Sequence, residues 1–236
     1  MLRRVEPELV SVWVALKEPR AVRLRVWQDI VDAGLGTTIF EGPAPLTQAG
    51  TFTRRVGDHL YVALVVAKPQ APLLPGTLYS YNVSLAAINT PVGSGDGPDL
   101  TKFETLADLK MLGLLAPASG QDRPHEPLGY QSGFLPSFAT PPADLEDLRI
   151  LHSSCRRIGY EGNDGLSWVD DLIQDWFEDP NRDPRTRPHQ SFHTGDQIYA
   201  DDVAGPMLYA IRQAINLLGI KEEQLPCTDK CLATNP

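Results

Sequence analysis

Apolar and polar residues alternate along much of the first hundred positions of the chain. A period of two is typical of half-buried β-strands, and "LVSVWVAL" (9–16) and "AVRLRVW" (21–27) both follow it. We interpret the opening run, residues 1–19, as the first strand of the fold. "HLYVALVVA" (59–67) is a denser apolar run, which predicts a strand covered on both faces.

A fourth strand is predicted at "PGTLYSYNVSLAA" (75–87), after a Pro-Gly turn. Its Tyr79 and Tyr81 share one face with the apolar residues that follow at the same spacing. Short strands at short intervals predict an N-terminal antiparallel β-sandwich, of fibronectin III or immunoglobulin type, over residues 1–105. Because this part lacks a cysteine pair, the fibronectin-like version is favoured.

Prolines recur along the second half of residues 106–144, and we predict a linker and a domain boundary there. "PASGQDRPHEP" (117–127) and "LPSFATPP" (135–142) resist regular structure. The apolar residues of "FLPSF" (134–138) indicate that the linker packs on a surface.

From residue 145 the pattern becomes strand, helix, strand, helix, which predicts a parallel βαβ arrangement over 145–236. Ser167 is the expected N-cap of the first helix, and Pro206 suits the first turn of the second. Ligands in such sheets collect beyond the carboxyl ends of the strands, where Cys155 and Asp196 are expected to lie. The four segments are "LRILHSSC" (148–155), "GLSWVDDLIQDWF" (165–177), "QSFHTG" (190–195) and 207–218.

Charge and composition exclude several classes of function. The formal net charge of −9 argues against nucleic-acid binding, which requires a clustered basic face. No run is apolar enough over about 18 residues for a membrane span. Glu6 and Glu8 interrupt the apolar start, so we read no signal peptide there and expect a cytoplasmic protein. Three cysteines form no disulfide framework, and Cys227 and Cys231 lack partners for a zinc site.

"SFHTGDQIYADD" (191–202) concentrates the candidate chemistry. Taken singly, each of its residues has an ordinary structural role: Asp196 a turn residue, Tyr199 a half-buried aromatic, and Asp201 and Asp202 a solvated acidic turn. By the same reasoning Cys155 is a small buried residue, and the histidines within the strands, His152 and His193, are core residues.

Together, a thiolate, a carboxylate and a phenol at adjacent strand ends offer ligands for one cation. Mixed soft and hard ligands favour iron or zinc, tyrosinate favours ferric iron, and carboxylates also suit calcium.

"SSC" followed by "TGDQIYADD" resembles the alkaline phosphatase D (PhoD-like) branch of the calcineurin-like metallophosphoesterases. The order of a β-sandwich followed by an α/β unit is similar as well. The resemblance implies that Asp196 bridges two metal ions and that Cys155 and Tyr199 are ligands. Iron and calcium are the favoured ions, with zinc or manganese as alternatives. It also implies hydrolysis of a phosphate ester by a metal-activated water.

The chain departs from this family after Gly195–Asp196, because no histidine follows His193. The resemblance therefore implies an incomplete α/β metallophosphoesterase domain, with weak single-metal binding and little or no hydrolysis. Uncovered apolar surface would then favour self-association. Arg156, Asp201, Asp202 and His193 are assigned only as possible substrate-contacting or supporting residues.

The sequence is also compatible with functions of two other classes, to different degrees. A binding module that uses the N-terminal sandwich is the main alternative. A nucleotide-binding βαβ unit is disfavoured, because "SSCRRIGYEGNDG" (153–165) has neither a dinucleotide glycine fingerprint nor a phosphate-binding loop.

Overall fold

The structure is a computed structural model. It describes residues 1–88, 97–117, 127–156, 165–197, 199 and 203–221. Within these ranges the chain is built mostly from antiparallel β-sheets with few helices, as the N-terminal pattern predicted.

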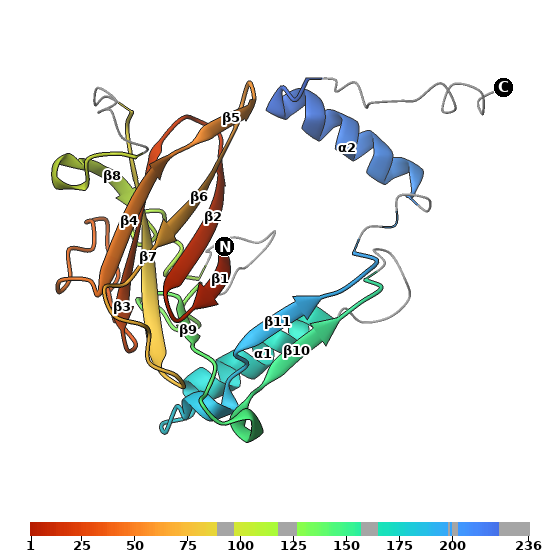
Figure 1. The fold of residues 1–236 in the computed structure, drawn as a ribbon. Helices are drawn as coiled ribbons and strands as arrows, with labels where there is room; N and C mark the ends of the chain where they lie inside the picture. The colour runs from red at the N-terminus through yellow and green to blue at the C-terminus, as the bar shows by residue number, and fades with distance from the viewer. Residues whose placement is uncertain (89–96, 118–126, 157–164, 198, 200–202, 222–236) are drawn as a thin grey trace.

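Two antiparallel sheets form the N-terminal part of the molecule (Figure 1). Their strands are β1 (Leu2–Glu6), β2 (Leu9–Leu16), β3 (Ala21–Gln28), β4 (Thr47–Phe52), β5 (Arg54–Gly57), β6 (Leu60–Ala67), β7 (Leu78–Ala86), β8 (Thr105–Asp108) and β9 (Ser137–Ala139). One sheet has the order β1-β2-β6-β5, and the other has the order β4-β3-β7-β8 with β9 also paired to β7. Apolar side chains from both sheets meet in one core, so the arrangement is a β-sandwich.

The first apolar run folds as a hairpin rather than as the single strand that was predicted. β1 and β2 pair antiparallel, with Val5 opposite Val10. Pro7 lies at the turn between them, where its missing N–H and fixed φ interrupt the strand.

The prediction of which strand is covered on both faces was wrong. β6 alternates between buried and exposed residues, and Leu64 is 52% exposed. β3, expected to be half-buried, is buried along nearly its whole length. The reason lies in a segment distant in sequence: Trp27 donates to the carbonyl of Pro43 (2.8 Å), and Arg25 donates to that of Phe40. This loop covers the outer face of β3.

Residues 106–144, predicted as a linker, contribute to the sandwich. β9 pairs with β7, and Phe138 stacks on Tyr79 with ring centroids 5.6 Å apart. Leu115 and Leu135 are buried in the core. The sheet therefore continues to Ala139, beyond the predicted boundary at residue 105.

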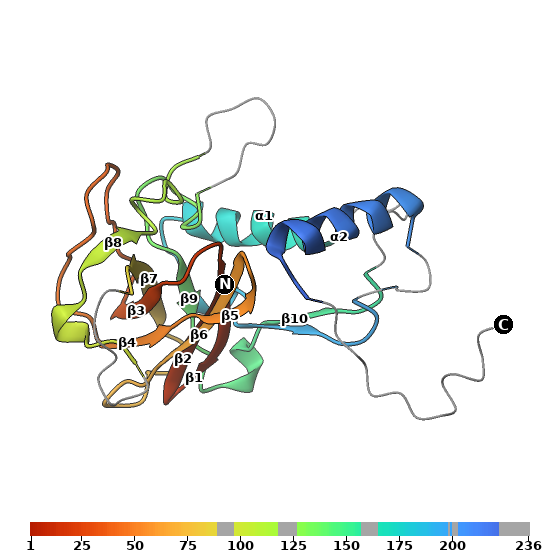
Figure 2. The same cartoon turned by 90° about the horizontal axis from the view of Figure 1, so that it is seen from above.

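The C-terminal part begins with a parallel pair of strands and the helix that connects them. Its elements are β10 (Ile150–Ser153), α1 (Gly165–Glu178), β11 (Gln190–His193) and α2 (Gly205–Leu218). β10 and β11 pair in parallel, with Ser153 opposite His193. α1 lies along one face of the pair (Figures 1 and 2). Ser167 is inside the first turn of α1, so it is not the N-cap that was predicted. Three short 3₁₀ helices complete the described elements: η1 (Leu100–Lys102), η2 (Leu145–Asp147) and η3 (Pro184–Thr186).

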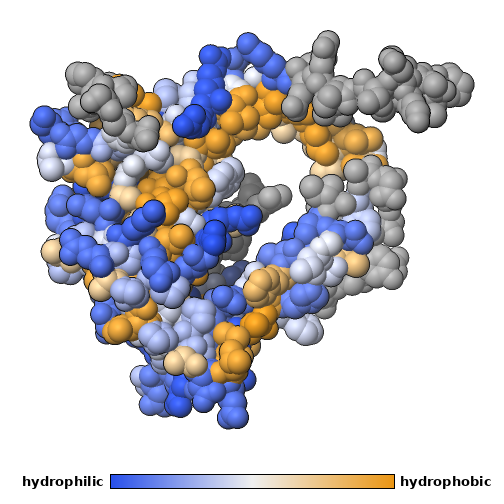
Figure 3. All heavy atoms as spheres, viewed as in Figure 1, coloured by the Kyte–Doolittle hydropathy of each residue, from blue (hydrophilic) through white to orange (hydrophobic). Residues whose placement is uncertain are grey.

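α2 returns to the sandwich at its C-terminal end. The amides of Asp58 and His59, in the β5–β6 turn, donate to the carbonyls of Gly219 (3.1 Å) and Leu218 (2.9 Å). Figure 3 shows an open hollow bounded by the sandwich, by α2 and by the β10–β11 pair, with apolar surface of α2 facing it. Among the described residues, none of the helices has the length and apolar content that a membrane crossing needs.

Candidate metal centre

The loops that follow β10 and β11 run side by side, because the parallel ladder continues beyond the two strands. The amide of Thr194 donates to the carbonyl of Ser153 (2.9 Å), and the amide of Cys155 donates to the carbonyl of Gly195 (3.4 Å). Parallel pairing places both carboxyl ends at the same edge. The two motifs that the sequence singled out are therefore neighbours in space.

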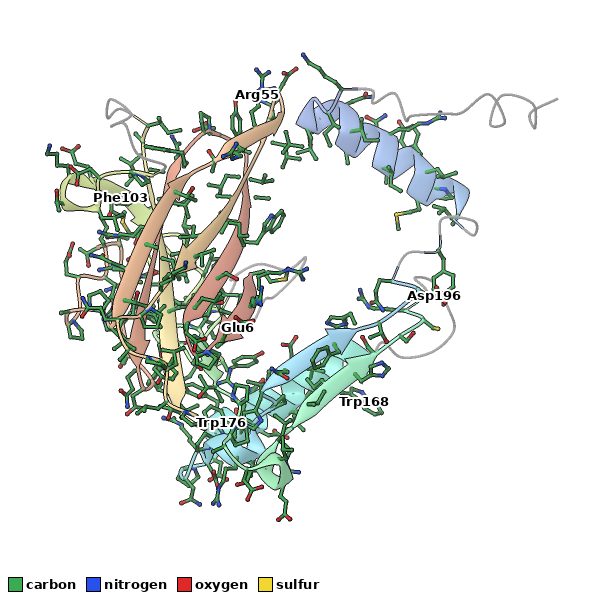
Figure 4. All side chains as sticks on the ribbon, viewed as in Figure 1. Glu6, Arg55, Phe103, Trp168, Trp176 and Asp196 are labelled. Atoms are coloured by element: carbon green, nitrogen blue, oxygen red, sulfur yellow. The ribbon has the colours of Figure 1, made fainter. Side chains whose placement is uncertain are left out.

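Cys155 and Asp196 are in direct contact. The Cys155 thiol lies 3.6 Å from Oδ2 of Asp196, and both residues are exposed. The Ser154 hydroxyl lies 3.5 Å from the same sulfur. The Gln197 amide donates to the carbonyl of Gly195 (2.9 Å), which supports the turn that carries Asp196. The structure thus places a thiol and a carboxylate together at the surface, where Figure 4 shows Asp196 at the far end of the β10–β11 pair.

Both residues have a backbone conformation that is unusual for a residue with a Cβ. φ is 57° at Cys155 and 46° at Asp196, and Gly195 between the strand and Asp196 has φ 64°. Left-handed φ values cost non-glycine residues roughly 1–3 kcal/mol and gather at functional sites. Among the described residues only five that are not glycine have positive φ, and these two are the pair in contact. The strain supports a functional role for this edge.

The pair has the chemistry of a metal site, although the set of donors is partial. A cation about 2.3 Å from a thiolate and about 2.1 Å from a carboxylate oxygen holds these atoms roughly 3–4 Å apart. The observed 3.6 Å matches that spacing. In the described ranges, however, no three His, Cys, Asp or Glu residues are grouped closely enough to hold a metal ion. The structure brings two potential donors, Cys155 and Asp196, into contact here.

The remaining candidate residues are distributed around this edge or fall outside it. Tyr199 is half-buried, and Arg156 is exposed immediately after Cys155. Asp201 and Asp202 lie outside the described residues. The candidate ligand set that the structure brings together is therefore Cys155 with Asp196.

The two histidines of the strands are exposed, so their interpretation as core residues was wrong. His193 Nδ1 lies 2.6 Å from the Ser153 hydroxyl, and its Nε2 lies 3.1 Å from that of Ser191. His152 Nε2 lies 2.6 Å from the Thr194 hydroxyl. Hydroxyl partners satisfy both rings without burial, because none of the described elements covers either ring.

Sequence reasoning assigned no role to Ser154 or Gln197, which contact or support the pair. The signal available for them was position alone, since each is one residue from a motif residue. Polar residues at strand ends are common in turns, so the pattern did not separate these two from ordinary turn residues.

No known family's sequence model matches the chain, and no curated protein sequence does either. Among solved structures, a bacterial adhesin from Mobiluncus mulieris containing intramolecular disulfide, isopeptide and ester bond cross-links is similar at 10% identity with a TM-score of 0.25. A second crystal form of the adhesin aligns at 11% identity with a TM-score of 0.24. Each alignment covers 62% of this chain and 53% of the adhesin chain, so this chain spans about half of that protein. Likeness at this level supports no inference about function.

Proposed function

We propose that the β10–β11 edge is part of the metal centre of a PhoD-like phosphoesterase, which hydrolyses phosphate esters. The observation that carries the proposal is the contact between Cys155 and Asp196, with sulfur and oxygen 3.6 Å apart and both residues at positive φ. The resemblance of "SSC" and "TGDQIYADD" to that family supplies the reaction class. An incomplete α/β phosphoesterase domain following the sandwich is part of the same proposal.

Each residue has a distinct role in this proposal. Asp196 would provide a carboxylate oxygen and Cys155 a thiolate, which requires loss of the thiol proton. Tyr199 would add a phenolate, with iron and calcium the favoured ions and zinc or manganese as alternatives. A bound ion would supply Lewis-acid activation of water and neutralise charge on phosphate oxygens. Arg156, next to Cys155 in the sequence, would contribute a contact to a phosphate oxygen.

This chain alone would bind one metal ion weakly and hydrolyse phosphate esters slowly or not at all. Two grouped ligands give a cation fewer bonds than the four that structural zinc or six that calcium takes. The described residues offer no larger group of His, Cys, Asp and Glu. Turnover by this chain at rates normal for a phosphatase would contradict this part of the proposal.

Metal binding tests the site directly, in a background with Cys227 and Cys231 changed to serine so that Cys155 is the remaining thiol. We expect Asp196→Asn and Cys155→Ser each to weaken zinc or ferric iron binding by about 10-fold or more, measured by calorimetry and by metal content after gel filtration. With ferric iron, Tyr199→Phe is expected to remove the tyrosinate-to-iron charge-transfer absorption.

Asp171→Asn is the matched control, because Asp171 is an exposed aspartate on α1 away from the motif. It should bind metal as the parent does. Equal loss of binding in Asp171→Asn and Asp196→Asn would point to nonspecific binding by an acidic chain and would reject the site.

A binding module is the second candidate, and an exposed apolar pair on the sandwich favours it. Trp13 on β2 is 40% exposed and lies opposite Leu64 on β6, which is 52% exposed. Exposed aromatic residues of this kind recur at protein interfaces. Trp13→Ala should then weaken partner binding without changing metal uptake, and Cys155→Ser should do the reverse.

A further inference from the structure

A cavity of about 280 Å³ lies where the sandwich meets the C-terminal part. Tyr81 and Phe138 line it from the sandwich side, and side chains of α1 and β11 line it from the other. Neither Cys155 nor Asp196 belongs to the lining. Trp176, which contacts a residue of the cavity wall, and Asp196 lie at opposite ends of the β10–β11 pair in Figure 4. The cavity is therefore separate from the candidate metal centre.

Arg187 places a buried positive charge in the cavity wall. The residue is 4% exposed, and its guanidinium lies over the Trp176 ring at 4.8 Å. Nη1 donates to the hydroxyl of Ser137 (2.8 Å) and Nη2 donates to the carbonyl of the same residue (2.6 Å). Burial lowers the pKa of Arg187 to about 10, so the guanidinium stays charged at neutral pH.

The partners of this cation are all neutral. Hydroxyl, carbonyl and aromatic ring contacts leave the charge without a counter-ion, and no ion pair of Arg187 occurs within the described ranges. The groups that act on its charge are the side chains of Tyr130 and Tyr81. Buried arginines are ordinarily paired with a carboxylate or another anion, because an unpaired buried charge is costly.

Two tyrosines line the same cavity and extend its polar side. Tyr130 has φ 63°, an uncommon conformation for a bulky residue, and its hydroxyl donates to the exposed carboxylate of Asp170 (2.9 Å). The Tyr81 hydroxyl makes no hydrogen bond to another residue in the part of the chain that the structure describes. Burial raises the pKa of Tyr81 to about 12, so its hydroxyl stays protonated and can donate a hydrogen bond to a ligand.

The other side of the cavity is apolar. Leu151 from β10 and Val169 and Ile173 from α1 line it. His189, also in the lining, is neutral: its Nδ1 accepts the amide of Arg149 (3.1 Å), and Nε2 contacts the carbonyl of Pro184 (3.1 Å). The volume is close to the lower end of the range for small-molecule sites. One cation, one available hydroxyl donor and an apolar wall describe a site for a small amphiphilic anion.

We propose that this cavity binds a small organic anion, with its carboxylate or phosphate group held by Arg187 and Tyr81 and its apolar body against Leu151, Val169 and Ile173. The ligand supplies the counter-ion that the fold omits around Arg187. The site is independent of the proposed metal centre, and its test does not involve metal.

Calorimetric titration at constant ionic strength, with three probes of one shape, tests the proposal on the unmodified chain. Benzoate and phenyl phosphate carry the anionic group on an aromatic ring, and benzamide is the neutral analogue of benzoate. We expect at least one anion to bind with a Kd on the order of 1 mM or below, and benzamide to bind about 10-fold or more weakly. Whichever of the two anions binds with the lower Kd shows whether the site prefers a carboxylate or a phosphate group. A change in tryptophan fluorescence gives a second readout, because Trp176, one of four tryptophans, contacts Arg187.

Variants then assign the residues. Arg187→Gln should weaken binding of the preferred anion by roughly 10- to 100-fold, because it removes the charge. Since Arg187 also bonds Ser137 and this variant risks misfolding, Tyr81→Phe provides a milder test that keeps the ring and removes one donor. It should weaken binding by about 3- to 10-fold. Arg185→Gln is the control, because Arg185 is an exposed arginine paired with Asp183.

The outcomes separate cleanly. Selective weakening by Tyr81→Phe, with Arg185→Gln unchanged, supports the site. Equal binding of benzoate and benzamide, no binding of either anion, or an unchanged Kd in a folded Tyr81→Phe variant would overturn it.

Discussion

The β-sandwich and the C-terminal part use apolar residues in opposite ways. The core cluster of buried apolar residues is drawn wholly from positions up to Phe138. After residue 145, Trp176 and Phe177 are the buried apolar side chains among those described. Trp168 on α1 is 67% exposed and Leu208 on α2 is 50% exposed. An amphipathic pattern therefore determines the type of element, while burial depends on whether another element covers its apolar face.

The two parts are held together at a small aromatic junction. Phe177 packs edge-on to Phe134 with centroids 5.4 Å apart, and Arg182 lies 4.4 Å over the Phe177 ring. Arg187 adds its hydrogen bonds to Ser137. The sandwich has its own core, whereas the buried apolar side chains described in the C-terminal part, Trp176 and Phe177, lie at this junction.

The largest difference between the parts is expected from matched leucine truncations. Leu24 in β3 is fully buried, so Leu24→Ala should lower the free energy of unfolding by about 2–5 kcal/mol. Leu208→Ala removes a half-exposed side chain and should change it by less than about 0.5 kcal/mol. Urea unfolding followed by circular dichroism measures both. Similar losses in the two variants would show that α2 is covered in solution.

The next largest expected effect is self-association of the chain through the exposed apolar face of α2. Changing Leu208 and Ile211 together to lysine should shift the chain toward monomer, because both lie exposed on one face of α2. Light scattering after gel filtration, over a range of protein concentrations, measures the change. Gln213→Lys adds one lysine to the same helix without removing an apolar side chain, and it should leave association nearly unchanged. A parent chain that stays monomeric at every concentration would reject the prediction.

The smallest expected effect is a pH dependence at the boundary between the two parts. Burial lowers the pKa of His189 below its ordinary value of 6.5. Below pH 6.5 the unfolded chain binds more protons at this residue than the folded chain, so stability falls as the pH is lowered through that window. His189→Gln should reduce the slope of stability against pH between 6.5 and 5. An unchanged slope in this variant would remove His189 as its source.

Local patterns were enough to predict most elements, including β2, β3 and the parallel pair that brings Cys155 to Asp196. It was harder to predict which face of each element is buried and which strands pair, because both depend on contacts between segments distant in sequence. The loop that covers β3 through Arg25 is one example, and the pairing of β9 with β7 is another. The Arg187 cavity left no signal in the sequence, since it requires residues from the sandwich, α1 and β11 to meet.

The contact between the C-terminal end of α2 and the β5–β6 turn depends on one glycine. A Cβ at Gly219 would lie 2.5 Å from the Cβ of Asp58, and its φ of 62° disfavours any other residue. A larger residue there would force the end of α2 and the β5–β6 turn apart, at the point where the amides of Asp58 and His59 donate to the carbonyls at that end. With glycine, two backbone hydrogen bonds join the end of the helix to the turn, so the sandwich and the C-terminal part meet at a second place besides the aromatic junction.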